Sequence, residues 1–293
     1  MKKLIISTLA LSISALTWAD DIAEVHTINH DTQFVRLMPI KLPSASNQKI
    51  TQNLEKSTPM LLATFGEATS IKLGMNNVPV LNQGMHGTCA TFAVTGALDA
   101  LMGKGDYISQ VCHLTLGQYL STHAYQLSGW DGAYSENVLG QINTYGIINK
   151  EKEKTQGCAG LTEYPAMDIT SPANEMSTDE FHQLSEEAAS SQRYDVTKVL
   201  DFYEFINREK TPTDVVKSIK NSLSKGDRLV IGVIVTTADG VGTYGKYHQK
   251  EDSWVITQEV SSAIKSDNYG GHAMIITGYD DNAVATDIHG KAH

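Results

Sequence analysis

The chain has 293 residues, of which 41% are hydrophobic and 19% are charged. This composition supplies enough apolar material for one large domain or for two lobes, and it excludes collagen-like, coiled-coil and wholly disordered chains. The formal net charge of −10, from 23 lysines and arginines against 33 aspartates and glutamates, argues against nucleic acid or an anionic membrane as a partner.

The first 19 residues have the pattern of a signal peptide. Lys2 and Lys3 form a basic start, an apolar stretch covers residues 4–16, and Thr17–Ala19 form a small-residue cleavage site. The apolar stretch is shorter than the ~18 residues that a membrane-spanning helix needs. We therefore predict export to a secreted or periplasmic location, where disulfides persist. A buried N-terminal helix is the less favoured alternative.

Residues 20–77 are polar and weakly patterned, and we interpret them as an N-terminal extension or pro-segment. The character of the sequence changes at Val78. A loop punctuated by glycines, over residues 82–88, leads into a helix whose apolar residues recur at helical spacing from Ala90 to Leu101. The glycines at positions 103 and 105 are expected to end this helix.

The remainder of the pattern separates helices from strands. Helical spacing is found over residues 116–125, 136–145 and 215–223, and we expect Gly146 to end the second of these helices. Continuous apolar runs over residues 229–235 and 272–279 are typical of buried strands. Helices first and strands second predict an α+β fold with two lobes.

Residues 171–193 have the composition of an insertion into this pattern. Ser177 and Glu180 form a capping box ahead of Phe181 and Leu184, which predicts a short helix. We favour the interpretation that this helix is a solvated lid or a surface appendage.

Three side chains point to chemistry when they are taken together. Cys89 stands where a loop enters a helix, and there the free N–H groups and the helix dipole favour a thiolate. Gln83 can offer an amide N–H to a developing oxyanion, and His272 begins a buried strand that can hold an imidazole rigidly. Taken singly, each has a plainer alternative: a small buried cysteine, a loop glutamine and a core histidine.

The sequence around these residues resembles that of the papain/cathepsin family of cysteine peptidases. Asn82–Ala93 is similar to the family's active-site segment N-Q-G-x-C-G-S-C-W-A-F. Further similar segments follow in the family's order: Leu114–Gln118, Asp131–Tyr134, Tyr145–Ile147, Glu163–Pro165 and Gly271–Tyr279. The resemblance implies a papain-like fold over residues 78–293, in which a helical lobe precedes an antiparallel β lobe.

The resemblance also implies a role for each matching residue. Cys89 would be the nucleophile, His272 the general base and acid, and Gln83 an oxyanion donor. Gly132 and Ala133 would offer backbone hydrogen bonds to an extended peptide. The implied activity is hydrolysis of peptide or protein substrates without a cofactor or metal, and the extension would cover the cleft as the pro-segment of a zymogen.

The sequence also departs from the family's pattern. His86 stands in place of a half-cystine, Ala90 in place of a tryptophan and Gly271 in place of an asparagine or aspartate. No Asn-Ser-Trp-Gly segment follows the histidine strand, so we expect the family's last strands to be missing from this sequence. The histidine is then unsupported, or another acceptor such as Asp287 orients it, or the sequence is a fragment.

If Cys89 is a free thiol, Cys112 and Cys158 remain as an even pair. A disulfide between them would close a loop of about 46 residues and contribute about 4 kcal/mol in the chain-entropy model. The alternative is two buried free thiols.

Two other functions stay open: a papain-like binding scaffold that has lost catalysis, favoured by Ala90 and Gly271, and a thiol transpeptidase. No Cys-x-x-Cys or His-Glu-x-x-His spacing occurs, so we expect no metal site.

Overall fold

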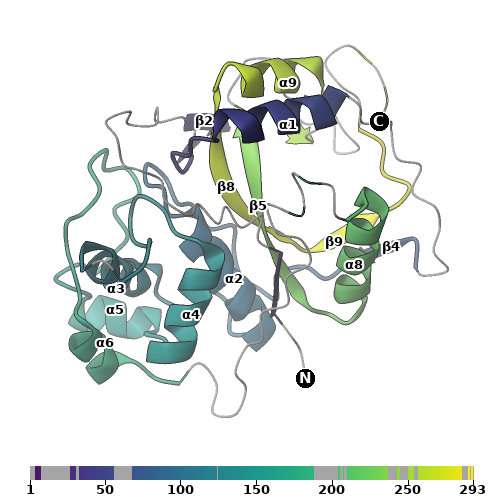
Figure 1. The fold of residues 1–293 in the computed structure, drawn as a ribbon. Coiled ribbons are helices and arrows are strands. Elements are labelled where there is room, and N and C mark those ends of the chain that lie inside the picture. Colours follow the sequence, from purple (N-terminus) through teal and green to yellow (C-terminus); the bar gives the residue numbers. More distant parts are fainter. Residues whose placement is uncertain are drawn as a thin grey trace.

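The structure is a computed structural model that describes residues 4–7, 27–30, 33–55, 68–123, 125–187, 204, 207, 210–236, 243–244, 250–253, 257–285, 290 and 292. Its described part has two halves, a helical lobe and a lobe built around paired strands (Figure 1). The predicted α+β class is confirmed: from residue 89 onward, helices come first and antiparallel strands follow.

The helical lobe is held together by apolar side chains from several helices. Its helices are α2 (Cys89–Met102), α3 (Gln110–Thr122), α4 (Ser135–Tyr145), α5 (Lys150–Gln156) and α6 (Thr178–Leu184). One core cluster joins Val94 and Leu98 of α2 to Leu139 and Ile142 of α4. These side chains are almost fully buried, so helix packing, rather than local propensity, fixes this lobe.

The predicted helix ends are largely confirmed. Gly103, with a φ of 68°, ends α2 and donates its N–H to the carbonyl of Asp99, and Gly146 ends α4. The predicted helix over residues 116–125 begins earlier, at Gln110, because the side chain of Ser109 accepts a hydrogen bond from the N–H of Cys112 at 2.9 Å.

The interpretation of α6 as a solvated appendage is wrong. The capping box is present, with Ser177 and Glu180 bonded reciprocally, but Phe181 is fully buried in the cluster that contains Cys112 and Cys158. The phenyl ring therefore makes α6 part of the core of the helical lobe.

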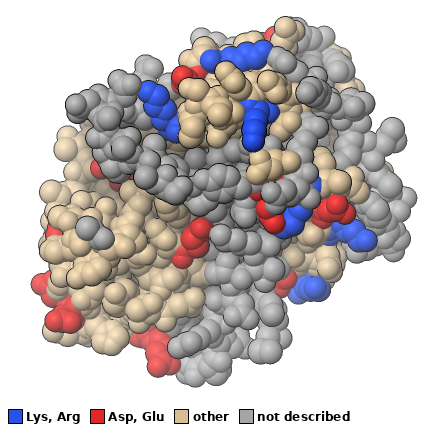
Figure 2. All heavy atoms as spheres, in the orientation of Figure 1, with Lys and Arg blue, Asp and Glu red and all other residues tan. Residues whose placement is uncertain are grey.

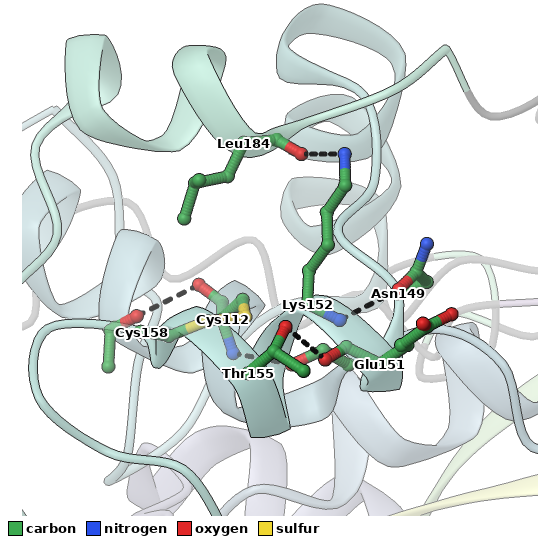
Figure 3. Close-up of a disulfide and its surroundings, with 9 residues drawn as sticks. Cys112, Asn149, Glu151, Lys152, Thr155, Cys158 and Leu184 are labelled. Atoms are coloured by element: carbon green, nitrogen blue, oxygen red, sulfur yellow. Dashed lines mark hydrogen bonds between the residues drawn. A yellow bond between two sulfur atoms is a disulfide. The ribbon is translucent and has the colours of Figure 1, made fainter.

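Figure 3 shows the disulfide under this helix. Cys112 and Cys158 are bonded with their Cα atoms 5.0 Å apart, which confirms the predicted pair, and Cys89 is a buried free thiol. Close by, the ammonium group of Lys152 donates to the carbonyl of Leu184, at the end of α6, at 2.6 Å (Figure 3). The disulfide links α3 to the loop around Cys158, and the hydrogen bond links α5 to the end of α6.

The second lobe contains the two predicted strands, but they are half-buried over much of their length rather than fully buried. β5 (Arg228–Thr236) pairs antiparallel with β8 (Tyr269–Ile276), β1 (Leu4–Ser7) pairs parallel with β5, and β4 (Ser70–Lys72) pairs antiparallel with β9 (Gly278–Asp280). The hairpins β2–β3 (Thr27–His30, Gln33–Arg36) and β6–β7 (Thr243–Tyr244, Lys250–Ser253) and the helices α8 (Pro212–Ser224) and α9 (Gln258–Lys265) complete it. The run over residues 272–279 breaks at Thr277 into two strands.

Part of the N-terminal extension is a helix that the sequence did not predict. α1 (Ser44–Glu55) lies along α9, and the side-chain amide of Asn47 donates to the carbonyl of Ile264 at 2.9 Å (Figure 1). An apolar cluster of Ile40, Leu42, Ile50, Ile264 and Tyr269 joins the two. β4 also lies within residues 20–77 and pairs with β9, so this part of the extension is built into the second lobe.

Charge is unevenly spread on the face drawn in Figure 2. Its acidic side chains lie over the helical lobe and in part of the other half, whereas its lysines and arginines lie over the half that carries α1, α8 and α9. Among the described helices, none is both long and apolar enough to cross a membrane. The predicted signal peptide falls on β1 and on residues outside the described ranges, and it stays a prediction.

Candidate active site

A pocket lies between the helical lobe and the strands β5 and β8. Its walls come from five segments: Met38 and Ile40 of the extension; Cys89 and Ala90; Ala133, Tyr134 and Ser135; Gly232, Val233 and Ile234; and Gly271, His272 and Ala273. Cys89 and His272 are 183 positions apart in the sequence (272 − 89). The fold thus brings the predicted nucleophile and the predicted general base to one pocket.

Cys89 is the first residue of α2 and is 3% exposed. The backbone amides of Ala273, Ala90 and Cys89 itself interact with the sulfur and favour its thiolate form, but burial outweighs them and raises the thiol pKa to about 11. The expected shift toward thiolate is therefore wrong for this covered state. Desolvation disfavours the charged form more than the amides at the helix N-terminus favour it.

His272 lies on β8 opposite Val233 of β5, and its pocket keeps it neutral. Burial lowers the pKa of the imidazole to about 4. Its Nδ1 atom is buried and has no hydrogen-bond partner among the described residues. Asp287, the predicted orienting residue, lies outside the described residues.

Gln83 is buried beside the start of α2, and its side-chain nitrogen donates two hydrogen bonds. One goes to the carbonyl of His86 in its own loop and the other to the carbonyl of Arg36 in the extension, both at 2.9 Å. The first bond fixes the orientation of the amide. The second engages its remaining N–H with a backbone carbonyl from another segment.

The extension forms part of the pocket wall and pairs there with β8. Met38 and Gly271 exchange two backbone hydrogen bonds, at 2.8 and 2.9 Å, in an antiparallel bridge. The side chain of Met38 also lies against Gly132, where a Cβ atom would be 2.7 Å from the sulfur. Gly132 and Ala133, the residues predicted to bind a peptide, therefore lie beside the chain's own extension.

An ion pair adds to these contacts of the extension. The guanidinium of Arg36 lies 3.6 Å from the carboxylate of Asp131, which also accepts a hydrogen bond from the hydroxyl of Ser171 at 2.9 Å. Asp131 directly precedes Gly132, and its side chain is 69% exposed. An exposed pair of this kind contributes little energy, about 0–1 kcal/mol, so the backbone bonds and buried apolar side chains hold the extension.

An aromatic cluster beneath the loop of residues 82–88 was not found from the sequence. His86 is fully buried and packs edge-on against Trp130 and Tyr164, with ring centroids 5.4 and 5.8 Å away. Its Nε2 atom lies 2.8 Å from the carbonyl of Pro165, which fixes the tautomer with the proton on Nε2, and burial lowers the pKa of the ring. The resemblance of Glu163–Pro165 to a family turn was the only sequence signal at this position.

Metal ligation has no support in the described part of the chain. No group of three or more histidine, cysteine, aspartate or glutamate side chains there is placed to hold a metal ion.

No family model and no curated protein matches the sequence. Among solved structures, the chain is similar to xylellain, a cysteine protease from Xylella fastidiosa, at 15% identity over 79% of this chain and 78% of that one, with a TM-score of 0.41. It is also similar to digestive procathepsin L 3 of the Tenebrio molitor larval midgut, at 15% identity over 82% and 68% of the two chains, with a TM-score of 0.36. Both similar structures are at low sequence identity and bear the names of cysteine protease and procathepsin.

Proposed function

We propose that the chain is an exported cysteine peptidase of papain type, which hydrolyses peptide bonds through an acyl-enzyme on Cys89. The observation that carries this proposal is the shared pocket. Its walls include a thiol at the N-terminus of α2, an imidazole on β8 and Met38 of the chain's own extension, whose backbone pairs antiparallel with Gly271 of β8. A strand that pairs with an extended polypeptide beside a thiol and an imidazole suits peptide hydrolysis.

In the proposed reaction, the Cys89 thiolate attacks the carbonyl carbon of a peptide bond. The resulting oxyanion accepts hydrogen bonds from the backbone N–H of Cys89 and the side-chain amide of Gln83. The imidazolium of His272 then gives its proton to the leaving amine, and the carbon–nitrogen bond breaks. His272 next takes a proton from water, whose oxygen attacks the thioester; the carbon–sulfur bond breaks and releases the carboxylic acid and the Cys89 thiolate, which restores the thiolate and imidazolium pair.

The hydrogen bonds of Gln83 support its part in this reaction. One N–H of the amide is used within the loop, on the carbonyl of His86, and therefore holds the group in place. The other meets a peptide carbonyl, that of Arg36. Displacement of the extension would free this second N–H for a substrate carbonyl.

We further propose that the extension is an inhibitory pro-segment. It shields the pocket, and the thiol pKa of about 11 and the imidazole pKa of about 4 mean that both groups are neutral at pH 7. Neutral cysteine is a poor nucleophile. Water and substrate would reach the pair only after the extension has left the pocket.

Cleavage of the extension tests the proposal. A site for a protease of defined specificity is introduced within residues 56–67, between α1 and β4, so that the chain folds with its extension and keeps β4. We expect cleavage and dilution to raise the initial rate of hydrolysis of a fluorogenic peptide at least tenfold, because the pocket opens. The same cleaved chain with Cys89→Ala is the control. An equal rate before and after cleavage would contradict the inhibitory role, and no hydrolysis in either state would contradict the peptidase.

One observation favours a second function, that of a papain-like binding scaffold without catalysis. The Nδ1 atom of His272 has no partner among the described residues, and an imidazole that nothing orients is a poor general base. If the protein is a scaffold, the Cys89→Ala variant should bind a peptide as well as the wild type does, and the wild type itself should hydrolyse no peptide.

Export is supported by the disulfide. A bond between Cys112 and Cys158 persists in an oxidising compartment and not in a reducing cytosol. Together with the predicted signal peptide, it favours a secreted or periplasmic location.

A further inference from the structure

We infer that Tyr164 is a positioning residue for the oxyanion site. Its hydroxyl connects Gln83 and Thr88, near the two ends of the loop of residues 82–88, and so it sets the Gln83 amide relative to Cys89. This inference rests on the proposed peptidase function, and it concerns a residue that does not itself line the pocket.

The hydrogen bonds of the hydroxyl have a fixed direction. The Tyr164 oxygen lies 2.7 Å from the carbonyl oxygen of Gln83 and 2.8 Å from the hydroxyl of Thr88. A carbonyl can only accept, so the phenol proton goes to Gln83 and the hydroxyl of Thr88 donates to the phenol oxygen. One side chain thus bonds the second residue of the loop, Gln83, and its last residue, Thr88, which directly precedes Cys89.

The ring that carries this hydroxyl is itself held from three sides. It packs edge-on against Phe92 in the first turns of α2, with the centroids 4.9 Å apart, and stacks on Trp130 at 5.7 Å with an interplanar angle of 21°. His86 contacts it edge-on from within the loop. Burial raises the pKa of the phenol, and a negative charge on Cys89 raises it further, so the group remains a neutral donor and lies within electrostatic reach of the thiol.

The loop also lies directly on the turn that contains Tyr164. The N–H of Met85 donates to the carbonyl of Ala166 at 2.8 Å. A Cβ atom on Gly84 would be 1.9 Å from the same oxygen, and the φ of Gly84 is 55°, so only glycine fits this approach. The turn therefore supports the middle of the loop while the hydroxyl of Tyr164 holds its ends.

An oxyanion donor contributes to catalysis only when it is held in position before the reaction. Loss of one such donor costs about 10²–10³ in kcat, so a donor that is present but loosely held should cost part of that amount. Alkylation of the thiol by iodoacetamide requires the thiolate but no oxyanion donor. The two reactions therefore separate a defect in the oxyanion site from a general loosening of the pocket.

The test uses Tyr164→Phe in the chain cleaved within residues 56–67. We expect kcat for peptide hydrolysis to fall about tenfold, with KM and the alkylation rate constant of Cys89 each within about twofold of the wild type. Thr88→Val, which removes the hydroxyl that donates to Tyr164, should produce the same pattern. Tyr145→Phe is the matched control, because it removes a hydroxyl from the cluster around the disulfide and should leave kcat unchanged.

Two results would overturn the inference. The first is a kcat for both Tyr164→Phe and Thr88→Val within twofold of the wild type. The second is an equal loss in kcat and in alkylation rate, which would indicate a purely structural role. The failure of the proposed function has a different signature, since the cleaved wild type would then hydrolyse no peptide while its Cys89 still reacted with iodoacetamide.

Discussion

Replacement of Cys89 by alanine is expected to lower kcat/KM for peptide hydrolysis by the cleaved chain by about 10⁴ or more, as loss of a catalytic nucleophile does in other hydrolases. The reason is that the proposed acyl-enzyme forms on the Cys89 sulfur, and Cys89 carries the sole thiol among the described residues that line the pocket. Initial rates over a range of peptide concentrations measure the effect. His272→Ala should cause a similar loss, since the leaving amine then lacks its proton donor.

The control for this prediction is the stability of the variants. Cys89 is small and buried, so Cys89→Ala should shift the thermal unfolding midpoint by only a few degrees, as about 1 kcal/mol does in a domain of this size. Residual hydrolysis within tenfold of the wild type, in a variant that is folded, would show that Cys89 is not the nucleophile.

Opening of the pocket is expected to raise the rate constant for alkylation of Cys89 by iodoacetamide at pH 7 by about 10³. With a pKa of about 11, only about one thiol in 10⁴ is ionised at pH 7 in the covered chain. Removal of the extension lets water reach the sulfur, while the amides of Ala90 and Ala273 continue to favour the thiolate. A pKa near 8 would then ionise about one thiol in ten.

The pH profile separates ionisation from simple access. In the intact chain the alkylation rate should rise tenfold for each pH unit up to about pH 10, whereas in the cleaved chain it should level off near the lowered pKa. Peptide mapping by mass spectrometry assigns the label, and Cys112 and Cys158 serve as internal controls because their disulfide protects them. Profiles that coincide before and after cleavage would show that the extension does not control the thiol.

Much of the framework of the pocket could be predicted from local chemistry. The glycine-rich loop before Cys89 and the glycine at position 103 define α2, and the continuous apolar runs define β5 and β8. These signals are strong because a left-handed glycine and a continuous apolar run each restrict the residues allowed. The placement of Cys89 and His272 in one pocket followed from the resemblance, not from these local signals.

The helices of the N-terminal extension and of residues 150–156, α1 and α5, could not be predicted from local sequence patterns. The sequences of α1 and α5 are mainly polar, so neither has an apolar face that helical spacing would reveal. α1 is stabilised by contacts of Ile50 and Asn47 with α9, which is more than 200 residues away in the sequence. Tertiary contacts of this kind leave no local pattern.

The state of the thiol was predicted wrongly for a related reason. A helix N-terminus favours a thiolate at Cys89, and that dipole is visible in the sequence. The desolvation that outweighs it comes from burial in the folded chain, where Met38 and Ile40 of the extension and residues of β5 and β8 line the same pocket, and their positions depend on the whole fold. The aromatic cluster of His86, Trp130 and Tyr164 is likewise assembled from three distant segments.

Titration of the cleaved chain with a peptidyl epoxide most directly tests the claim that Cys89 is the nucleophile of a peptidase. Hydrolysis of a fluorogenic peptide and the fraction of Cys89 that carries the label are measured in the same samples. We expect hydrolysis to fall in proportion to the labelled fraction and to reach zero when each chain carries one label on Cys89. Hydrolysis that persists when Cys89 is fully labelled, or a cleaved chain that hydrolyses no peptide before labelling, would contradict the claim.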